Sequence, residues 1–140
     1  MIFPPNLSLD IINDWGKNTM TDFLDIKFTA IGDDYLEATM PVDNRTKQPF
    51  GLLHGGANVV LAETLGSVAA TLTVDKDSQF CVGLEINANH LKSVKKGLVR
   101  GVTKPIHLGK KTQVWEIKIY TPGNELSCIS RITMAVIDKK

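Results

Sequence analysis

Hydrophobic and polar residues alternate along most of the second half of the chain, whereas one long stretch in the middle is almost uniformly apolar. This stretch, from Gly55 to Val74, is apolar or small on nearly every side, and its length suits a helix better than a strand. A helix that is apolar on every side must be buried on every side. We therefore expect a central helix that other elements enclose.

Strand-like segments lie on both sides of this helix. Two short ones precede it and are joined at Gly32-Asp33-Asp34, a sequence typical of hairpin turns. Four longer ones follow it, and the alternation from Trp115 to Ile119 indicates one buried and one wet face. The six expected strands span residues 24–31, 35–42, 80–94, 97–108, 111–120 and 126–137. We predict one α+β domain over residues 1–140, a long antiparallel sheet curled around the helix.

The first residues predict a small helical element and give no targeting signal. Ser8 caps an amphipathic pattern that ends near Gly16 and resumes after Thr19, as expected of a lid or plug. No basic start followed by an apolar run is present, and no stretch of about 18 apolar residues occurs. We expect a soluble cytoplasmic protein in which Cys81 and Cys128, far apart in alternating stretches, are reduced core thiols.

The formal net charge of +1 hides an uneven distribution of charge. No acidic residue occurs from Ile86 to Trp115, a segment that contains seven basic ones, so the remainder carries 1 − 7 = −6. Such a local positive field attracts a nucleotide phosphate, a nucleic acid or an anionic membrane. The alternative is a solvated, lysine-rich pair of strands. The basic residues are Lys92, Lys95, Lys96, Arg100, Lys104, Lys110 and Lys111.

Glu63 is the one charged residue of the expected central helix, and its sequence neighbours offer it no partner. A buried unpaired carboxylate either becomes neutral or lies at a wet cleft where its charge is used. The alternative is a structural carboxylate that a distant basic group or backbone amide satisfies. Ser67 lies four residues further on, on the same helical face, and is placed to bond the carboxylate or a water beside it.

The start of the helix carries a second group of candidate residues. His54-Gly55-Gly56 precedes it directly, and the first turn of a helix presents unpaired N–H groups with a partial positive charge. The Gly55 N–H is therefore a candidate donor to the oxyanion of a tetrahedral intermediate. His54 either polarises the carbonyl or simply holds the turn by hydrogen bonds. Gln48 lies in the loop before the helix. Its neutral amide either donates a second hydrogen bond or holds the acyl group, or it is merely solvated.

Other chemistries lack their sequence patterns. There is no Gly-x-Ser-x-Gly elbow and no phosphate-cradling glycine loop. The three histidines lack metal-ligand spacing with cysteines or carboxylates, so we expect no metal site. A cysteine nucleophile would need a nearby base that the sequence does not show.

Two adjacent segments, Gln48 to Gly56 and Val59 to Ser67, resemble the hotdog-fold acyl-CoA thioesterases that use a glutamate. This group includes 1,4-dihydroxy-2-naphthoyl-CoA thioesterases and enterobactin-pathway proofreading thioesterases, relatives of the 4-hydroxybenzoyl-CoA thioesterases. The likeness extends over nearly the whole chain, including Glu85 to His90 and Pro105 to Gly109. One departure is Asn58, where the family pattern favours a smaller or apolar residue.

The resemblance implies a hotdog fold and hydrolysis of an acyl-CoA, aromatic acyl groups foremost, as in menaquinone biosynthesis. An acylated carrier protein is the alternative substrate. Glu63 would be the nucleophile or general base, and Gly55 the oxyanion donor. Gln48 would be the amide near the thioester, His54 the residue that positions that loop, and Ser67 the hydroxyl that holds the carboxylate or water. The active site would lie between two subunits of a homotetramer, a dimer of dimers. No cofactor is implied, because coenzyme A is part of the substrate. Its implied binding residues are Val82, Gly83, His90, Lys92, Gly109 and Lys110, with Lys111 as a further phosphate contact.

Two other classes of function compete with hydrolysis. A non-catalytic acyl-CoA-binding domain could use the same fold, although the chain lacks the extra DNA-binding helix of a regulator. Nucleic-acid binding through the basic segment has little support, since the chain has two tryptophans, two tyrosines and no known reader motif. We therefore expect neither nucleic acid nor membrane as a partner.

Overall fold

Six antiparallel strands form one sheet in the computed structural model, which describes residues 1–140. Their order across the sheet is β1-β2-β4-β5-β6-β3. The strands are β1 (Lys27–Ile31), β2 (Leu36–Pro41), β3 (Gln79–His90), β4 (Leu98–Leu108), β5 (Thr112–Tyr120) and β6 (Leu126–Asp138). The helices are α1 (Leu9–Trp15), α2 (Met20–Phe23) and α3 (Gly55–Leu72). The architecture predicted from the sequence is confirmed.

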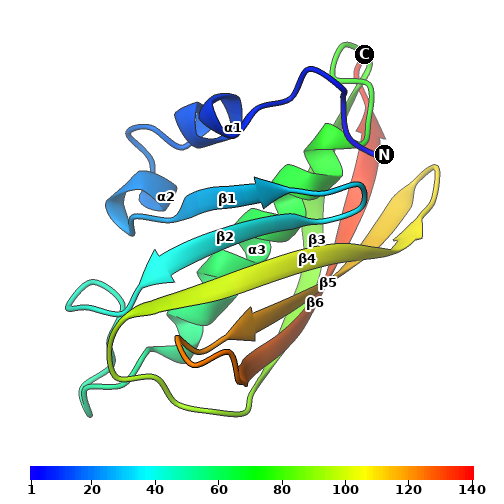
Figure 1. Ribbon diagram of the computed structural model, residues 1–140. Helices are drawn as coiled ribbons and strands as arrows, with labels where there is room; N and C mark the ends of the chain where they lie inside the picture. The colour runs from blue at the N-terminus through cyan, green and yellow to red at the C-terminus, as the bar shows by residue number, and fades with distance from the viewer.

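The sheet curls around α3, which lies on its concave side (Figure 1). Leu61, Leu65 and Ala69 of the helix are fully buried against the strands. Gly66 permits this close approach, because a Cβ added there would lie 2.5 Å from Cγ2 of Ile132 on β6. The helix axis is thereby held against the middle of the sheet, and its register fixes where each functional side chain emerges.

One expectation about α3 is wrong for the single chain. The helix is not buried on every side: Glu63 and Thr71 are exposed, and Val59, Val60, Ser67 and Val68 are half-buried. The sheet stops at β3, whose outer edge has no neighbouring strand and whose residues Val82 and Leu84 are exposed. A sheet of this width covers only part of the helix circumference, so one side of α3 stays open beside β3.

The strand limits differ from the predicted ones chiefly after β3. This strand ends at His90, four residues before the expected end at Val94. The N–H groups of Leu91 and Lys92 still donate to the Ser127 carbonyl of β6 (2.7 and 3.2 Å). The chain then leaves the sheet, and the Val94 carbonyl accepts from the Leu53 N–H (2.8 Å). The segment after β3 therefore crosses toward the loop that precedes α3. The predicted two-sided character of β5 is confirmed by its alternating burial.

The N-terminal helices cover the edge of the sheet at β1. Ser8 caps α1 as predicted, its Oγ accepting from the Ile11 N–H (3.2 Å). The Asn13 side chain pairs with the backbone of Phe28 on β1, donating to its carbonyl (3.1 Å) and accepting from its N–H (2.8 Å). An edge strand covered in this way is protected from pairing with other chains. None of the three helices combines the length and the apolar character needed to cross a membrane.

Candidate active site

His54 begins α3 as its N-cap residue. Its Nδ1 accepts a hydrogen bond from the Gly56 N–H (2.8 Å), and its carbonyl accepts from the N–H groups of Ala57 (3.0 Å) and Asn58 (3.2 Å). An acceptor Nδ1 in a neutral imidazole means that the proton is on Nε2. The side chain thus satisfies one of the donors that every helix start leaves unpaired. In the single chain, His54 holds the turn.

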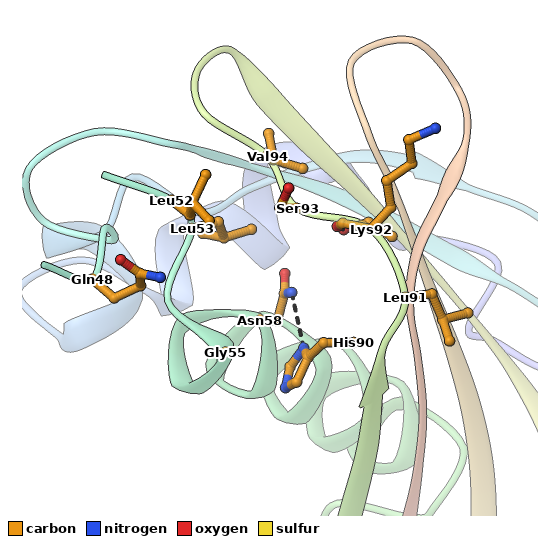
Figure 2. Close-up of a pocket in the computed structure, with 11 residues that line it drawn as sticks. Gln48, Leu52, Leu53, Gly55, Asn58, His90, Leu91, Lys92, Ser93 and Val94 are labelled. Atoms are coloured by element: carbon orange, nitrogen blue, oxygen red, sulfur yellow. Dashed lines mark hydrogen bonds between the residues drawn. The ribbon is translucent and has the colours of Figure 1, made fainter. Parts of the chain in front are cut away.

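The Gly55 N–H has no hydrogen-bond partner within the protein, and Gly55 lines a pocket of about 310 Å³. Gln48 lies across this pocket from His90 (Figure 2). The Gln48 Oε1 accepts from the Phe50 N–H, which leaves its amide nitrogen free to donate. The tight loop depends on Gly51, whose φ of +83° is in the left-handed region. The structure therefore places two free N–H donors, from Gly55 and Gln48, at one pocket.

Asn58 is a pocket residue that the sequence analysis treated only as a departure from the family pattern. It is 4% exposed, and its Nδ2 lies 3.3 Å from His90 Nδ1 (Figure 2). An amide NH₂ group is a donor only, so this contact makes His90 Nδ1 the acceptor and places the ring proton on Nε2. A polar residue in an apolar helix was the signal that could have identified it.

Glu63 lies elsewhere on the helix, in the open strip beside β3. Its carboxylate is exposed and makes no hydrogen bond or ion pair within the chain. Gly83 of β3 is its close neighbour: a Cβ added there would lie 2.9 Å from Glu63 Oε2. Ser67 does not form the expected bond to Glu63, because its hydroxyl points to the Met134 Sδ at 3.9 Å. The carboxylate is thus free rather than structurally paired.

The single chain keeps these two groups apart. Gly55 and Glu63 are eight residues apart on one helix, which places them about 12 Å apart along its axis. The pocket at the start of the helix includes Gln48, Gly55, Asn58 and His90, and does not include Glu63. A smaller hollow of about 180 Å³ contains Glu63 with Gly83 and Ile132. We call the first group the pocket half-site and the second the carboxylate half-site.

The residues expected to bind coenzyme A are spread over three places. His90 and Lys92 line the pocket half-site, whereas Val82 and Gly83 lie on β3 near Glu63. Gly109 and Lys110 line a third hollow of about 640 Å³, together with Lys111 and Asp138. Each of the three places contains one pair of the expected residues, and the structure of the single chain does not bring the three pairs together.

The basic segment is partly neutralised within the fold. Lys92 forms an ion pair with Glu125, and Arg100 pairs with Glu37 (3.0 Å) while also lying over the Tyr120 ring. Lys95, Lys96, Lys110 and Lys111 form no ion pair in the chain. The positive field available to an anion is therefore weaker at Lys92 than at these lysines.

The two cysteines are free thiols, as predicted. Burial raises the pKa of the Cys128 thiol to about 11 and also raises the pKa of Cys81. A thiol is nucleophilic only as the thiolate. Cys128 pairs in register with His90 and so lies close to the pocket, yet at neutral pH it stays protonated. The free groups that remain at the site are the carboxylate and the N–H donors.

A curved antiparallel sheet around one long helix, with a free N–H at the helix start, defines a hotdog-fold protein with an acyl-transfer type of site. The chain belongs to the thioesterase superfamily, whose family profile matches residues 50–128, and it is a thioester hydrolase. It is 57% identical to the 1,4-dihydroxy-2-naphthoyl-CoA hydrolase of Escherichia coli K12, over 98% of this chain and 100% of the relative. It is 51% identical to the proofreading thioesterase EntH of Cronobacter sakazakii, over 98% and 99% respectively.

A solved structure shows the same fold. A crystal structure of a mutant thioesterase from Pseudomonas aeruginosa superposes with a TM-score of 0.97 at 49% sequence identity, covering 99% of this chain and 100% of that one. The fold and the reaction class expected from the sequence are confirmed. The roles of the individual site residues stay predictions.

Proposed function

We propose that the protein hydrolyses acyl-CoA thioesters to the free acid and coenzyme A, with aromatic acyl groups as the preferred substrates. The observation that carries this proposal is an exposed, unpaired Glu63 carboxylate on the same helix whose first N–H, at Gly55, is free and faces a pocket. The similarity to a 1,4-dihydroxy-2-naphthoyl-CoA hydrolase supports an aromatic substrate. With that acyl group the enzyme acts in the cytoplasm, in menaquinone biosynthesis.

The chemistry needs a nucleophile at the thioester carbon and a donor at its oxygen. The Gly55 N–H, at the positive end of the helix dipole, stabilises the oxyanion. Glu63 either removes a proton from the attacking water or attacks the carbon itself. In the second route a mixed anhydride forms, the thiolate leaves and takes a proton, and water then cleaves the anhydride. Both routes consume one water and release one acid and one thiol.

Because a single chain separates the half-sites, we propose that the active site forms between two copies. The open strip of α3 and the free edge of β3 lie side by side, and exposed Val82 and Leu84 give that edge an apolar surface. A second copy in this place would bring its Gln48 and Gly55 to Glu63. Such isologous contacts produce two identical sites, and pairs of dimers produce a tetramer.

The test compares wild type with Glu63→Gln on benzoyl-CoA, 1,4-dihydroxy-2-naphthoyl-CoA and fatty acyl-CoA, following release of the free thiol. Glutamine keeps the shape but loses the base and the nucleophile, so kcat should fall about a thousandfold. Glu116→Gln, on the solvent-facing side of β5, is the matched control and should keep full activity. Absence of turnover on every substrate, or full activity of Glu63→Gln, would refute the proposal.

An EntH relative that acts in proofreading supports a second substrate, an aryl thioester of a carrier protein. Both substrates end in the same phosphopantetheine thiol, and they differ in what surrounds it. Comparing kcat/KM for one acyl group on coenzyme A and on a carrier protein distinguishes them. The preferred substrate is the thioester, of coenzyme A or of the carrier protein, that has the higher kcat/KM.

A further inference from the structure

The buried amide of Asn58 has one end that nothing in the protein satisfies. Its Nδ2 contacts His90 Nδ1, but its Oδ1 has no hydrogen-bond partner, although the residue is only 4% exposed. It is the one buried side-chain oxygen or nitrogen in the chain left in this state. A buried polar group without a partner destabilises the fold, and such groups are rare in folded proteins.

The contact with His90 accounts for the nitrogen of the Asn58 amide, but nothing in the chain accounts for its oxygen. Asn58 lies inside α3, where asparagine is a poorer helix former than alanine or leucine. The flanking helix residues that face the sheet, Ala57, Leu61 and Ala62, are all apolar and buried. An apolar side chain in place of Asn58 would extend this surface and remove an unsatisfied group.

The free oxygen is directed into the pocket half-site. Asn58 lines that pocket together with Gly55, three residues earlier and so on the same side of the helix. In Figure 2 the Asn58 oxygen points away from His90, toward the segment that carries Ser93. A thioester whose carbonyl bonds the Gly55 N–H therefore occupies the pocket that Asn58 also lines, on the same side of the helix as this oxygen.

We propose that Asn58 is a further substrate-binding residue, whose Oδ1 accepts a hydrogen bond from an N–H or O–H of the thioester next to its carbonyl. The inference rests on the proposed function and deepens it. Two parts of the substrate carry such a donor: a hydroxyl on an aromatic acyl group, and an amide of the pantetheine arm. His90 holds the amide in place by taking up its Nδ2, which leaves the oxygen for the ligand.

The experiment measures ratios of kcat/KM between substrates that differ by one donor. For the acyl group, 2-, 3- and 4-hydroxybenzoyl-CoA are each compared with benzoyl-CoA. For the thiol part of the substrate, S-benzoyl-N-acetylcysteamine, which has an amide, is compared with S-propyl thiobenzoate, which has none. Each ratio is measured for wild type, Asn58→Leu, which is close in size, and Asn58→Ala. Asn44→Ala, at an exposed asparagine, is the control.

We expect one of these ratios to fall about tenfold in both Asn58 variants and to stay unchanged in Asn44→Ala. The ratio that falls identifies the donor. The effect of a hydroxyl on the reactivity of the thioester cancels, because the same substrates are used with every variant. Any loss of folded protein cancels as well, because both substrates of a pair are measured on one sample.

Thermal unfolding provides a readout that separates binding from a structural role. Asn58→Leu removes the unsatisfied oxygen together with the Nδ2 contact to His90, an exposed residue whose Nδ1 water can then satisfy, so Tm should stay within a few degrees of wild type. Ratios that match wild type in both variants would overturn the inference while leaving hydrolysis intact. A wild type inactive on the whole panel would overturn the proposed function, and this inference with it.

Discussion

The two half-sites on α3 each contain a polar group without a partner, yet they differ in burial. Asn58 Oδ1 is enclosed by the chain, whereas the Glu63 carboxylate is open to solvent. The buried group destabilises the single chain, because water cannot reach it freely. The open one stays hydrated and has no such effect until another surface covers it. This difference agrees with the proposed function, in which the pocket half-site receives the thioester and a second copy covers the carboxylate half-site.

The largest expected effect comes from combining two damaged chains. Gly55→Ala places a methyl group 2.8 Å from His90 Nε2 and so damages the pocket half-site. Glu63→Gln damages the carboxylate half-site. Each variant alone should be nearly inactive. When the two variants are co-expressed, a dimer with one copy of each contains one intact site and one doubly damaged site. Purification through two different tags isolates this mixed dimer. An unselected statistical mixture of dimers regains about a quarter of the wild-type number of intact sites.

Thiol release from benzoyl-CoA measures this recovery. The control is the same pair of variants mixed after purification and assayed before their subunits exchange. Activity no higher than the sum of the separate variants would show that the half-sites of different chains do not meet.

A smaller effect is expected from Gly83→Ala, which tests the carboxylate half-site alone. The added Cβ would lie 2.9 Å from Glu63 Oε2, so the carboxylate must turn away. Misplacement of a reacting group by about an ångström lowers kcat by about tenfold or more. Steady-state kinetics and thermal unfolding should show this fall with Tm unchanged. Gly123→Ala, where the new Cβ meets only Thr121 at 3.7 Å, is the control, and equal kcat values for the two would contradict the prediction.

The smallest effect is expected at the N-cap of the pocket half-site. His54→Ala removes the acceptor of the Gly56 N–H and should cost about 1 kcal/mol of stability. This corresponds to a fall in Tm of about 3 °C. His54→Asn offers an oxygen to the same N–H and should regain most of this loss. Calorimetry on the two variants measures the difference, and identical Tm values would show that the cap contributes nothing.

The fold was predictable because its signals are local. Alternation from Trp115 to Ile119 and the apolar stretch after Gly55 each determine an element by themselves. The lone charge of Glu63 and the glycines at the helix start were visible for the same reason. These residues stand out against their immediate neighbours in the sequence.

The rest of the site depends on contacts between distant residues. Asn58 meets His90 across 32 positions, and Ser67 meets Met134 across 67, so neither contact leaves a trace in local spacing. The end of β3 was misplaced because Leu91 and Val94 are as apolar as strand residues, although their backbones bond to Ser127 and Leu53. Even the uncovered strip of α3 was hidden, because its valines resemble core residues.

The hollow that contains Lys110 also contains Ile2 and Asp138, together with Thr73 and Val74 at the end of α3. Both chain ends therefore lie beside the last turn of this helix, and Figure 1 shows them near each other. The helix has 18 residues, so this end is about 27 Å from the pocket half-site. A fusion partner or an immobilising tag attached at either terminus would therefore lie far from the pocket half-site, but beside Gly109 and Lys110.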